Sequence, residues 1–236
     1  MGKIHAGTSG WAYSSWKPDF YPAKLASAKF LEHYATRLNS VEVNYTFRAQ
    51  VTEKLLAGWI AATPVDFKFA VKVHQSITHI KRLRSAAKLM SDFLASLEPL
   101  REAGKLGPVL VQLPPNFKCD VGRLEEFLEG LPRGARVAIE FRHPSWFADD
   151  VYARLRRGDV ALCWAESEDL ETPDVATAGF SYFRLRKEKY SRRARTAVKE
   201  RVHKAARRGE VFAYFKHEDT PDGAFYAEAL LRNSDK

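Results

Sequence analysis

The sequence has only two cysteines, Cys119 and Cys163, among its 236 residues. Two cysteines cannot form a disulfide framework, so we expect both to be free thiols in a reducing cytoplasm. No apolar run approaches the roughly 20 residues that a membrane span needs, and residues 1–20 lack the apolar stretch of a signal peptide. These absences predict a cytoplasmic protein that has no membrane partner.

Glycine and proline are also sparse, at 13 and 11 residues, which excludes collagen-like and low-complexity sequence. No Gly-rich phosphate loop follows an apolar segment, and neither a G-x-S-x-G motif nor a local Cys/His signature supports acyl transfer. The hydrophobic fraction of 45% and the charged fraction of 28% are typical of a globular protein.

The net charge of +9 comes from one segment. Residues 184–208 hold twelve of the 38 Lys and Arg residues but only two of the 29 Asp and Glu residues. The rest of the chain therefore has 26 basic and 27 acidic residues, a balance near zero. Any attraction for an anionic partner must involve this basic segment.

Short apolar segments alternate with amphipathic ones along the whole chain. The apolar segments are rich in β-branched and aromatic residues and predict strands at 4–8, 40–47, 66–73, 108–113, 136–142, 159–164, 180–186 and 210–216. Helical patterns lie between most of them, for example at 85–98, 149–157, 194–208 and 221–232.

Eight βα units of about thirty residues predict an α/β fold, a short single-domain TIM-type (β/α)₈ barrel over residues 1–236. Residues 167–179 contain Pro173 and little periodicity, so we expect an irregular sixth connection. The alternative, an open doubly wound sheet, lacks the Gly-rich loop that would support it.

Charged residues occupy strands that should be buried on both faces. Alternation places apolar side chains toward the helices and turns the intervening side chains into the barrel. Most of these inward residues lie at the carboxyl ends of their strands, where barrels of this type carry their active sites. They comprise two carboxylates, three cations and two amides: Glu42, Glu140, Lys72, Arg142, Arg184, Asn44 and Gln112.

Two interpretations of this cluster stay open. It is either an ion-pair network that fills the core or a functional site. Clustering at one end favours the site, since a core without chemistry would more simply use Val, Ile and Leu.

Four motifs in chain order carry a resemblance: GTSGW (7–11), VEVNYTF (41–47), VQLPPNF (111–117) and EFRHPSW (140–146). With them the chain resembles the YecE-like family, domain of unknown function 72. The resemblance implies a TIM-type barrel with its pocket at the strand carboxyl ends, but it supplies no reaction. The chain departs from the family where Leu185 is followed by Arg186 and Lys187 in place of His-Gly. It also has Lys216 and His217 after Phe215 in place of an Asn pair. Both departures add positive charge to the mouth.

Further candidates lie just beyond the strands. In the aromatic loop 11–21, Trp11 is the expected ligand contact, and the loop is either a stacking platform or a plug over the barrel. Trp146 and His143 follow the fifth strand in the same way. The histidines at 74, 79, 143 and 217 could ligate a metal together with Glu140. Nearby cations oppose that, so no cofactor or metal is predicted.

These features predict an enzyme, of hydrolase or lyase type, that acts on an anionic, phosphate-bearing small molecule. Glu42 or Glu140 would be the general acid or base, and Lys72, Arg142 and Arg184 would stabilise negative charge. Arg184 and Arg186, with Lys216, would bind the phosphate. One alternative is a nucleic-acid-binding protein that uses residues 184–208, unless these form only a solvated helix face. Another is a non-catalytic binder of small ligands.

Overall fold

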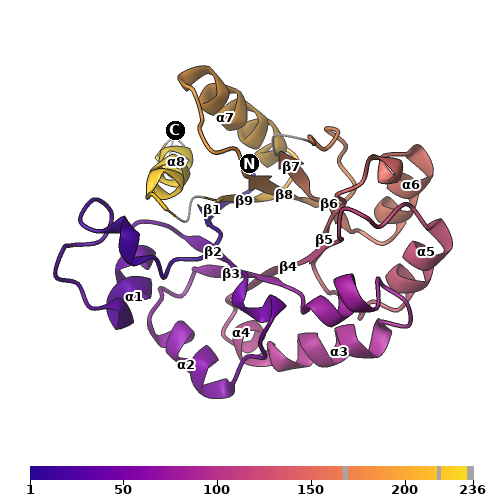
Figure 1. Cartoon of the computed structure of the whole chain (residues 1–236), viewed down its shortest axis with the longest axis horizontal. Helices are drawn as coiled ribbons and strands as arrows, with labels where there is room; N and C mark the ends of the chain where they lie inside the picture. Colours follow the sequence, from indigo (N-terminus) through magenta and orange to yellow (C-terminus); the bar gives the residue numbers. More distant parts are fainter. Residues whose placement is uncertain (167–169, 217–218, 233–236) are drawn as a thin grey trace.

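The computed structural model describes residues 1–166, 170–216 and 219–232. Its strands are all parallel and form two sheets, in the orders β1-β9-β8-β7 and β2-β3-β4-β5-β6. The strands span Ile4–Thr8 (β1), Ser40–Val43 (β2), Lys68–Lys72 (β3), Leu106–Gln112 (β4), Val137–Glu140 (β5), Ala161–Leu162 (β6), Trp164–Glu166 (β7), Phe180–Leu185 (β8) and Glu210–Phe215 (β9). Together the sheets form a TIM-type barrel with helices outside it (Figure 1), which confirms the predicted fold.

The two sheets join at two seams. At the first, β1 and β2 lie side by side, and a parallel bridge joins Ser9 to Glu42. At the second, β6 and β7 are halves of the predicted sixth strand. Cys163 lies between them and donates its N–H to Ile139 of β5, while Trp164 already pairs with Phe183 of β8. At Cys163 the sixth strand therefore stops pairing with β5 and begins to pair with β8.

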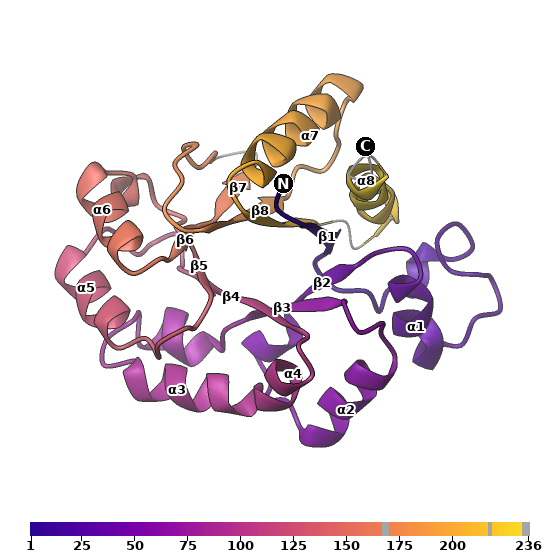
Figure 2. The same ribbon diagram turned by 180° about the vertical axis from the view of Figure 1, so that it is seen from behind.

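Eight helices cover the outside of the barrel in the described residues, as the view from behind also shows (Figure 2). The helix expected at 85–98 is α3, and a short further helix that was not expected, α4, follows it with Pro99 in its first turn. The helices span Phe30–Ala35 (α1), Glu53–Ala61 (α2), Ala87–Ser96 (α3), Glu98–Glu102 (α4), Val121–Glu129 (α5), Asp149–Arg157 (α6), Arg192–Ala206 (α7) and Asp222–Leu231 (α8). None of the helices in the described part of the chain is long and apolar enough to cross a membrane.

The sixth connection is irregular, as expected, and residues 170–179 contain no helix. It folds back along the interrupted strand. The Thr177 hydroxyl accepts from the Leu162 N–H at 2.7 Å, and the Thr172 hydroxyl accepts from the Ala165 N–H at 3.1 Å. Two side chains thus satisfy backbone donors that a continuous sheet would have paired.

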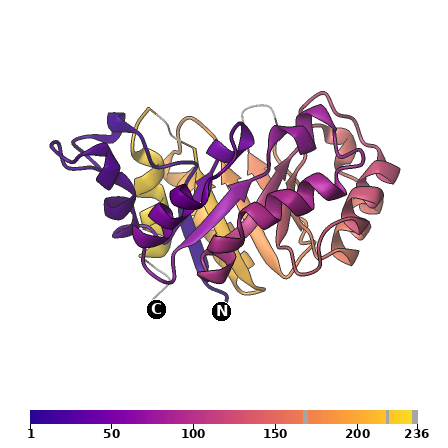
Figure 3. The same ribbon diagram turned by 90° about the horizontal axis from the view of Figure 1, so that it is seen from below.

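The core has two layers that follow the predicted alternation. The larger layer lies between the strands and the helices. The smaller one fills the barrel, where small residues on one side face large aromatic residues on the other. It consists of Ala70, Leu110, Ala138, Ala161, Cys163, Ala165, Phe180, Tyr182, Phe212 and Tyr214. The side view places the N-terminus at one end of the barrel (Figure 3). We call the opposite end, where the strands finish, the mouth.

Several strand predictions were too long, and the largest difference is at the second strand. The segment 40–47 was expected to be extended throughout, but β2 ends at Val43 and residues Tyr45–Phe47 form a 3₁₀ turn. Asn44 has helical angles, with φ −98° and ψ −12°. Alternation therefore fails after Val43, and Tyr45 is 55% exposed at the mouth instead of packing under a helix.

Gly7 allows β1 to approach β2 at the first seam. A Cβ on Gly7 would lie 1.9 Å from the Ser40 carbonyl oxygen, which is backbone and cannot swing away. We therefore expect Gly7→Ala to lower the free energy of unfolding by about 3 kcal/mol, at the upper end of overpacking effects. Gly58→Ala in α2, where a Cβ meets nothing within 4 Å, should instead stabilise by about 0.5–1 kcal/mol. Urea unfolding measures both, and equal effects would contradict this account of the seam.

Candidate functional site

Arg184 lies at the centre of the mouth and is 1% exposed. Its Nε and Nη2 donate to the two carboxylate oxygens of Glu42, at 2.9 and 2.7 Å. Its Nη1 donates to Glu140 at 2.5 Å and to Gln112 at 3.2 Å. One guanidinium on β8 therefore binds three strands of the other sheet. The inward convergence predicted from alternation is observed.

Glu42 is saturated with hydrogen bonds. Besides Arg184, its carboxylate accepts from the hydroxyls of Ser9 and Tyr182, each at 2.8 Å, and from the Asn44 amide at 3.3 Å. Burial alone would raise its pKa, but the charge and hydrogen bonds of Arg184 outweigh burial and lower the pKa to about 2. Glu42 thus stays ionised at neutral pH, with its oxygens occupied by donors.

Glu140 is also fully buried. Its second oxygen accepts from Arg142 at 3.2 Å. Burial raises the pKa of Glu140, and the charges of Arg184 and Arg186 bring it below its usual value. The two carboxylates and Arg184 therefore form an ion-pair network at the base of the mouth, the first of the two interpretations given to these residues.

Two cations above this network lack carboxylate partners. Nη1 of Arg186 is buried and has no hydrogen-bond partner among the described residues. Burial and the charge of Arg184 lower the pKa of Arg186. Nζ of Lys72 lies 4.1 Å from the centre of the Phe47 ring. Burial lowers the pKa of Lys72 to about 8, and Arg184 adds to the effect.

These cations line what we call the basic cleft, an open hollow of about 580 Å³. It is bordered by Asn44, Tyr45, Phe47, Arg48, Ala49, Lys72, Arg184, Arg186 and Lys216. Counted with Arg142, the mouth has six cationic side chains against the two buried carboxylates. Lys216 directly follows β9, whereas His217 lies outside the described residues.

A second hollow, the aromatic cleft, adjoins the basic cleft. It measures about 400 Å³, and Asn44 and Tyr45 line both. Its walls are Ser9, Gly10, Trp11, Ala12, Tyr13, Val43, Asn44, Tyr45, Leu55 and Trp59. Sequence reasoning found Trp11 and Asn44 but missed Tyr45, because it treated that residue as part of a strand.

The aromatic loop 11–21 divides between the two interpretations given to it. Trp11 and Tyr13 line the aromatic cleft, whereas Trp16, Phe20 and Tyr21 are buried and pack against one another. Gly10 has φ +95°, and a Cβ there would lie 2.5 Å from the Tyr13 hydroxyl. A glycine is needed at this position to bring Trp11 beside the end of β1.

Two expected ligand contacts have other roles in the structure. Trp146 is wholly buried; it stacks on Phe141 and donates its indole N–H to the Phe117 carbonyl at 2.7 Å. Its expected position as a ligand contact is therefore wrong, because the turn after β5 folds it inward. His143 begins that turn, and its Nδ1 accepts from the Ser145 N–H.

Helix α7 carries most of the basic segment away from the mouth. It connects the carboxyl end of β8 with the start of β9, so it runs down the side of the barrel (Figure 1). Arg201 lies 3.6 Å from Asp174 and stacks on Trp164, and Lys204 lies 3.7 Å from Asp174. Arg184 and Arg186 thus belong to the mouth, and the cations of α7 belong to a separate outer surface.

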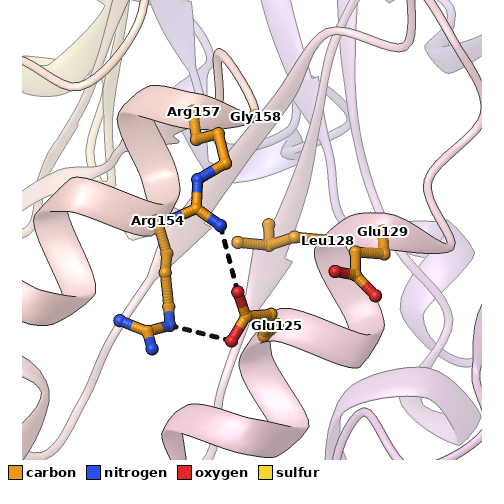
Figure 4. A pocket seen from close by; sticks show the side chains of 6 residues that line it. All are labelled: Glu125, Leu128, Glu129, Arg154, Arg157 and Gly158. Carbon is orange, nitrogen blue, oxygen red and sulfur yellow. Dashed lines mark hydrogen bonds and ion pairs between the residues drawn. The ribbon is translucent and has the colours of Figure 1, made fainter.

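A further pocket lies between α5 and α6 on the outside of the barrel (Figure 4). Its arginines, Arg154 and Arg157, both bind Glu125, at 3.3 and 3.1 Å. Paired charges of this kind distinguish it from the basic cleft. Within the described ranges, no three His, Cys, Asp or Glu side chains are grouped so as to hold a metal ion.

Fold and site together define a TIM-type barrel whose mouth carries a buried arginine–carboxylate network under two cations, Lys72 and Arg186, that have no carboxylate partner among the described residues. The family described as "Protein of unknown function DUF72" matches residues 5–236. The chain belongs to this family.

Two curated relatives are UPF0759 proteins. YunF of Bacillus subtilis (strain 168) is 31% identical over 170 residues, which are 70% of this chain and 59% of YunF. YecE of Escherichia coli (strain K12) is 32% identical over 146 residues, 61% of this chain and 50% of YecE. The chain thus matches between half and three fifths of the length of these relatives.

Solved structures share the fold over the full chain. A DUF72 family protein from Thermotoga maritima MSB8 is 26% identical, with a TM-score of 0.85, over 99% of this chain and 100% of the other. A DUF72 family protein from Enterococcus faecalis V583 has a TM-score of 0.81 at 20% identity, over 99% and 97% of the two chains. SacUVDE, at 11% identity and a TM-score of 0.54 over both whole chains, shares the fold alone.

Removing one partner of the Arg184 network should destabilise the protein. Glu42→Gln leaves Arg184 with one carboxylate in a buried site, so we expect a loss of about 3–5 kcal/mol in the free energy of unfolding. Glu125→Gln, which breaks the exposed pairs of Figure 4, should lose less than about 1 kcal/mol. Urea unfolding at pH 7 compares the two, and a loss below 1 kcal/mol for Glu42→Gln would refute the network's structural role.

Lys72 should make stability depend on pH. Its folded pKa of about 8 lies below the unfolded value of about 10.4. Between these values the unfolded chain binds more protons, so stability rises with pH. We expect Lys72→Met to be more stable than wild type by about 2–3 kcal/mol at pH 7, and the difference should fade between pH 8 and 10.5. Unfolding at several pH values, with the exposed Lys88→Met as control, measures this; a difference that stays constant with pH would contradict it.

Proposed function

We propose that this chain is an enzyme that acts on a small phosphate-bearing anion bound in the basic cleft. The observation that carries the proposal is Arg186: a guanidinium with a buried, unpartnered nitrogen, beside Lys72, in an open cleft. A buried guanidinium N–H without a hydrogen-bond partner is costly, and a phosphate oxygen would supply the missing partner.

The position of the cleft supports the same conclusion. Arg186 and Lys216 directly follow β8 and β9, which are the seventh and eighth strands of the barrel when β6 and β7 count as one. Loops after these strands frequently bind phosphate in TIM barrels. Because Arg184 is already held by two carboxylates, the anion would lie on Arg186, Lys72 and Lys216.

The network also bears on the chemistry. Glu42 and Glu140 are ionised and bound to arginines, so their role is to hold Arg184 in place. Lys72 has a pKa near neutrality, which suits a group that gives or takes a proton during turnover. In a hydrolase or lyase reaction, Lys72 would donate a proton to the leaving group, and Arg184 and Arg186 would stabilise the negative charge that develops.

Anion binding provides the test. Calorimetric titration with ribose 5-phosphate should show binding to wild type, and Arg186→Gln should weaken it about 10–100-fold, the loss of one charge-assisted contact. Binding should also weaken as pH rises above 8, where Lys72 loses its proton. Arg157→Gln, in the pocket of Figure 4, should leave binding unchanged. Equal loss in both variants, or no binding to wild type, would refute the proposal.

Turnover distinguishes an enzyme from a non-catalytic binder. We expect one compound in a panel of phosphorylated metabolites, followed by NMR, to be consumed by wild type. Lys72→Met should bind that compound more weakly, because one cation of the cleft is gone, and should fail to consume it even at saturating concentration. Binding without consumption of any compound would favour the non-catalytic binder.

A further inference from the structure

The basic and aromatic clefts share two residues. Asn44 and Tyr45 lie between them, at the point where β2 ends and the 3₁₀ turn begins. The two hollows are therefore neighbours at the mouth, and a ligand that reaches across Asn44 and Tyr45 would contact both. Each lies within the range of about 300–1,000 Å³ that small-molecule sites cover.

The two hollows differ in chemistry. Lys72, Arg186 and Lys216 supply positive charge on one side. On the other side Trp11 packs edge-on against Trp59, with ring centres 5.6 Å apart, and Tyr45 exposes 55% of its surface. Solvent-exposed aromatic rings beside cations are the usual platform for a flat ring attached to a phosphate.

The junction is polar. The Asn44 amide nitrogen donates to Glu42, which leaves its carbonyl oxygen Oδ1 buried and without a partner among the described residues. An unpaired acceptor between a cationic and an aromatic cleft fits a linker that carries hydroxyl groups. A sugar between phosphate and base has this character.

We propose that the two clefts form one site for a nucleoside monophosphate, with the phosphate in the basic cleft, the sugar beside Asn44 and the base against Trp11 and Tyr45. The assignment rests on the proposed function for its phosphate. The new element is the base, which would bind in the aromatic cleft. Phosphate binding alone would leave that cleft without a role.

Calorimetry with three probes tests the assignment: adenosine 5′-monophosphate, ribose 5-phosphate and adenosine. Stacking of a base contributes about 1–3 kcal/mol, so the monophosphate should bind wild type roughly 5–150-fold more tightly than ribose 5-phosphate. Adenosine, without the phosphate, should bind more weakly than the monophosphate.

Two variants separate the clefts. Tyr45→Ala should reduce the preference for the monophosphate and leave ribose 5-phosphate binding unchanged. Arg186→Gln should weaken both phosphate ligands by the same factor. Val65→Ala, which removes another exposed apolar side chain, serves as the matched control and should change neither. Thermal unfolding of each variant confirms that it is folded.

The outcomes distinguish this inference from the proposed function. If ribose 5-phosphate binds as tightly as the monophosphate, the base site is refuted and the anion site stands. If no phosphate ligand binds, the proposed function and this inference are both refuted. If adenosine binds as tightly as the monophosphate, the link between the clefts is refuted. A 5′-phosphorylated trinucleotide is the last probe. If it binds more than tenfold more tightly than the monophosphate, the ligand is the end of a nucleic-acid strand, and the proposal of a free nucleotide is refuted.

Discussion

The fork of Arg184 between Glu42 and Glu140 is the constraint on which the mouth depends. It joins β8 to β2 and β5, and so ties the two sheets together across the barrel, away from the seams. It also forms ion pairs with both buried carboxylates of the mouth. Both carboxylates are bound to arginines, so in the described part of the chain neither pairs with Lys72 or Arg186 above them, which is the charge arrangement on which the proposed anion site rests. The structural interpretation of the inward charges therefore holds for Arg184, Glu42 and Glu140, and the functional interpretation stays a proposal for the cations above them.

The interior below this fork explains how so much charge is tolerated. Small residues on β3 to β5 leave room for Tyr182 and Tyr214 from the other sheet. The Tyr182 hydroxyl donates upward to Glu42, and the Tyr214 hydroxyl bonds to Ser40 at 2.6 Å. These aromatic side chains fill the barrel with apolar rings and place their polar ends where the charged layer and the strand edges need partners. The charged layer thus lies directly above a layer of packed side chains that hydrogen-bond to it and to the strands.

The sequence was sufficient to predict the barrel and the converging residues of its regular strands, because alternation in a parallel strand decides which side chains point inward. Glu42, Lys72, Gln112, Glu140 and Arg184 all follow from that rule. The rule fails where a strand stops. Tyr45 and Trp146 lie in 3₁₀ turns, and no local pattern shows that one faces solvent and the other the core. The pairing of charges was also beyond prediction, since alternation brings Arg184 and Arg186 to one place without showing which of them meets the carboxylates.

The separation of the mouth into a buried ion-pair layer and a rim above it has a consequence for how such a protein can diversify. Residues that hold the barrel together, Arg184 with Glu42 and Glu140, lie beneath those that would meet a ligand. Arg186 and Lys216 each come one residue after a strand has ended, at the positions where this chain departs from the family pattern that its motifs resemble. Exchange of these residues leaves the tie between the sheets intact. A lineage can therefore acquire a new ligand by point substitution at the rim, without passing through intermediates that fail to fold.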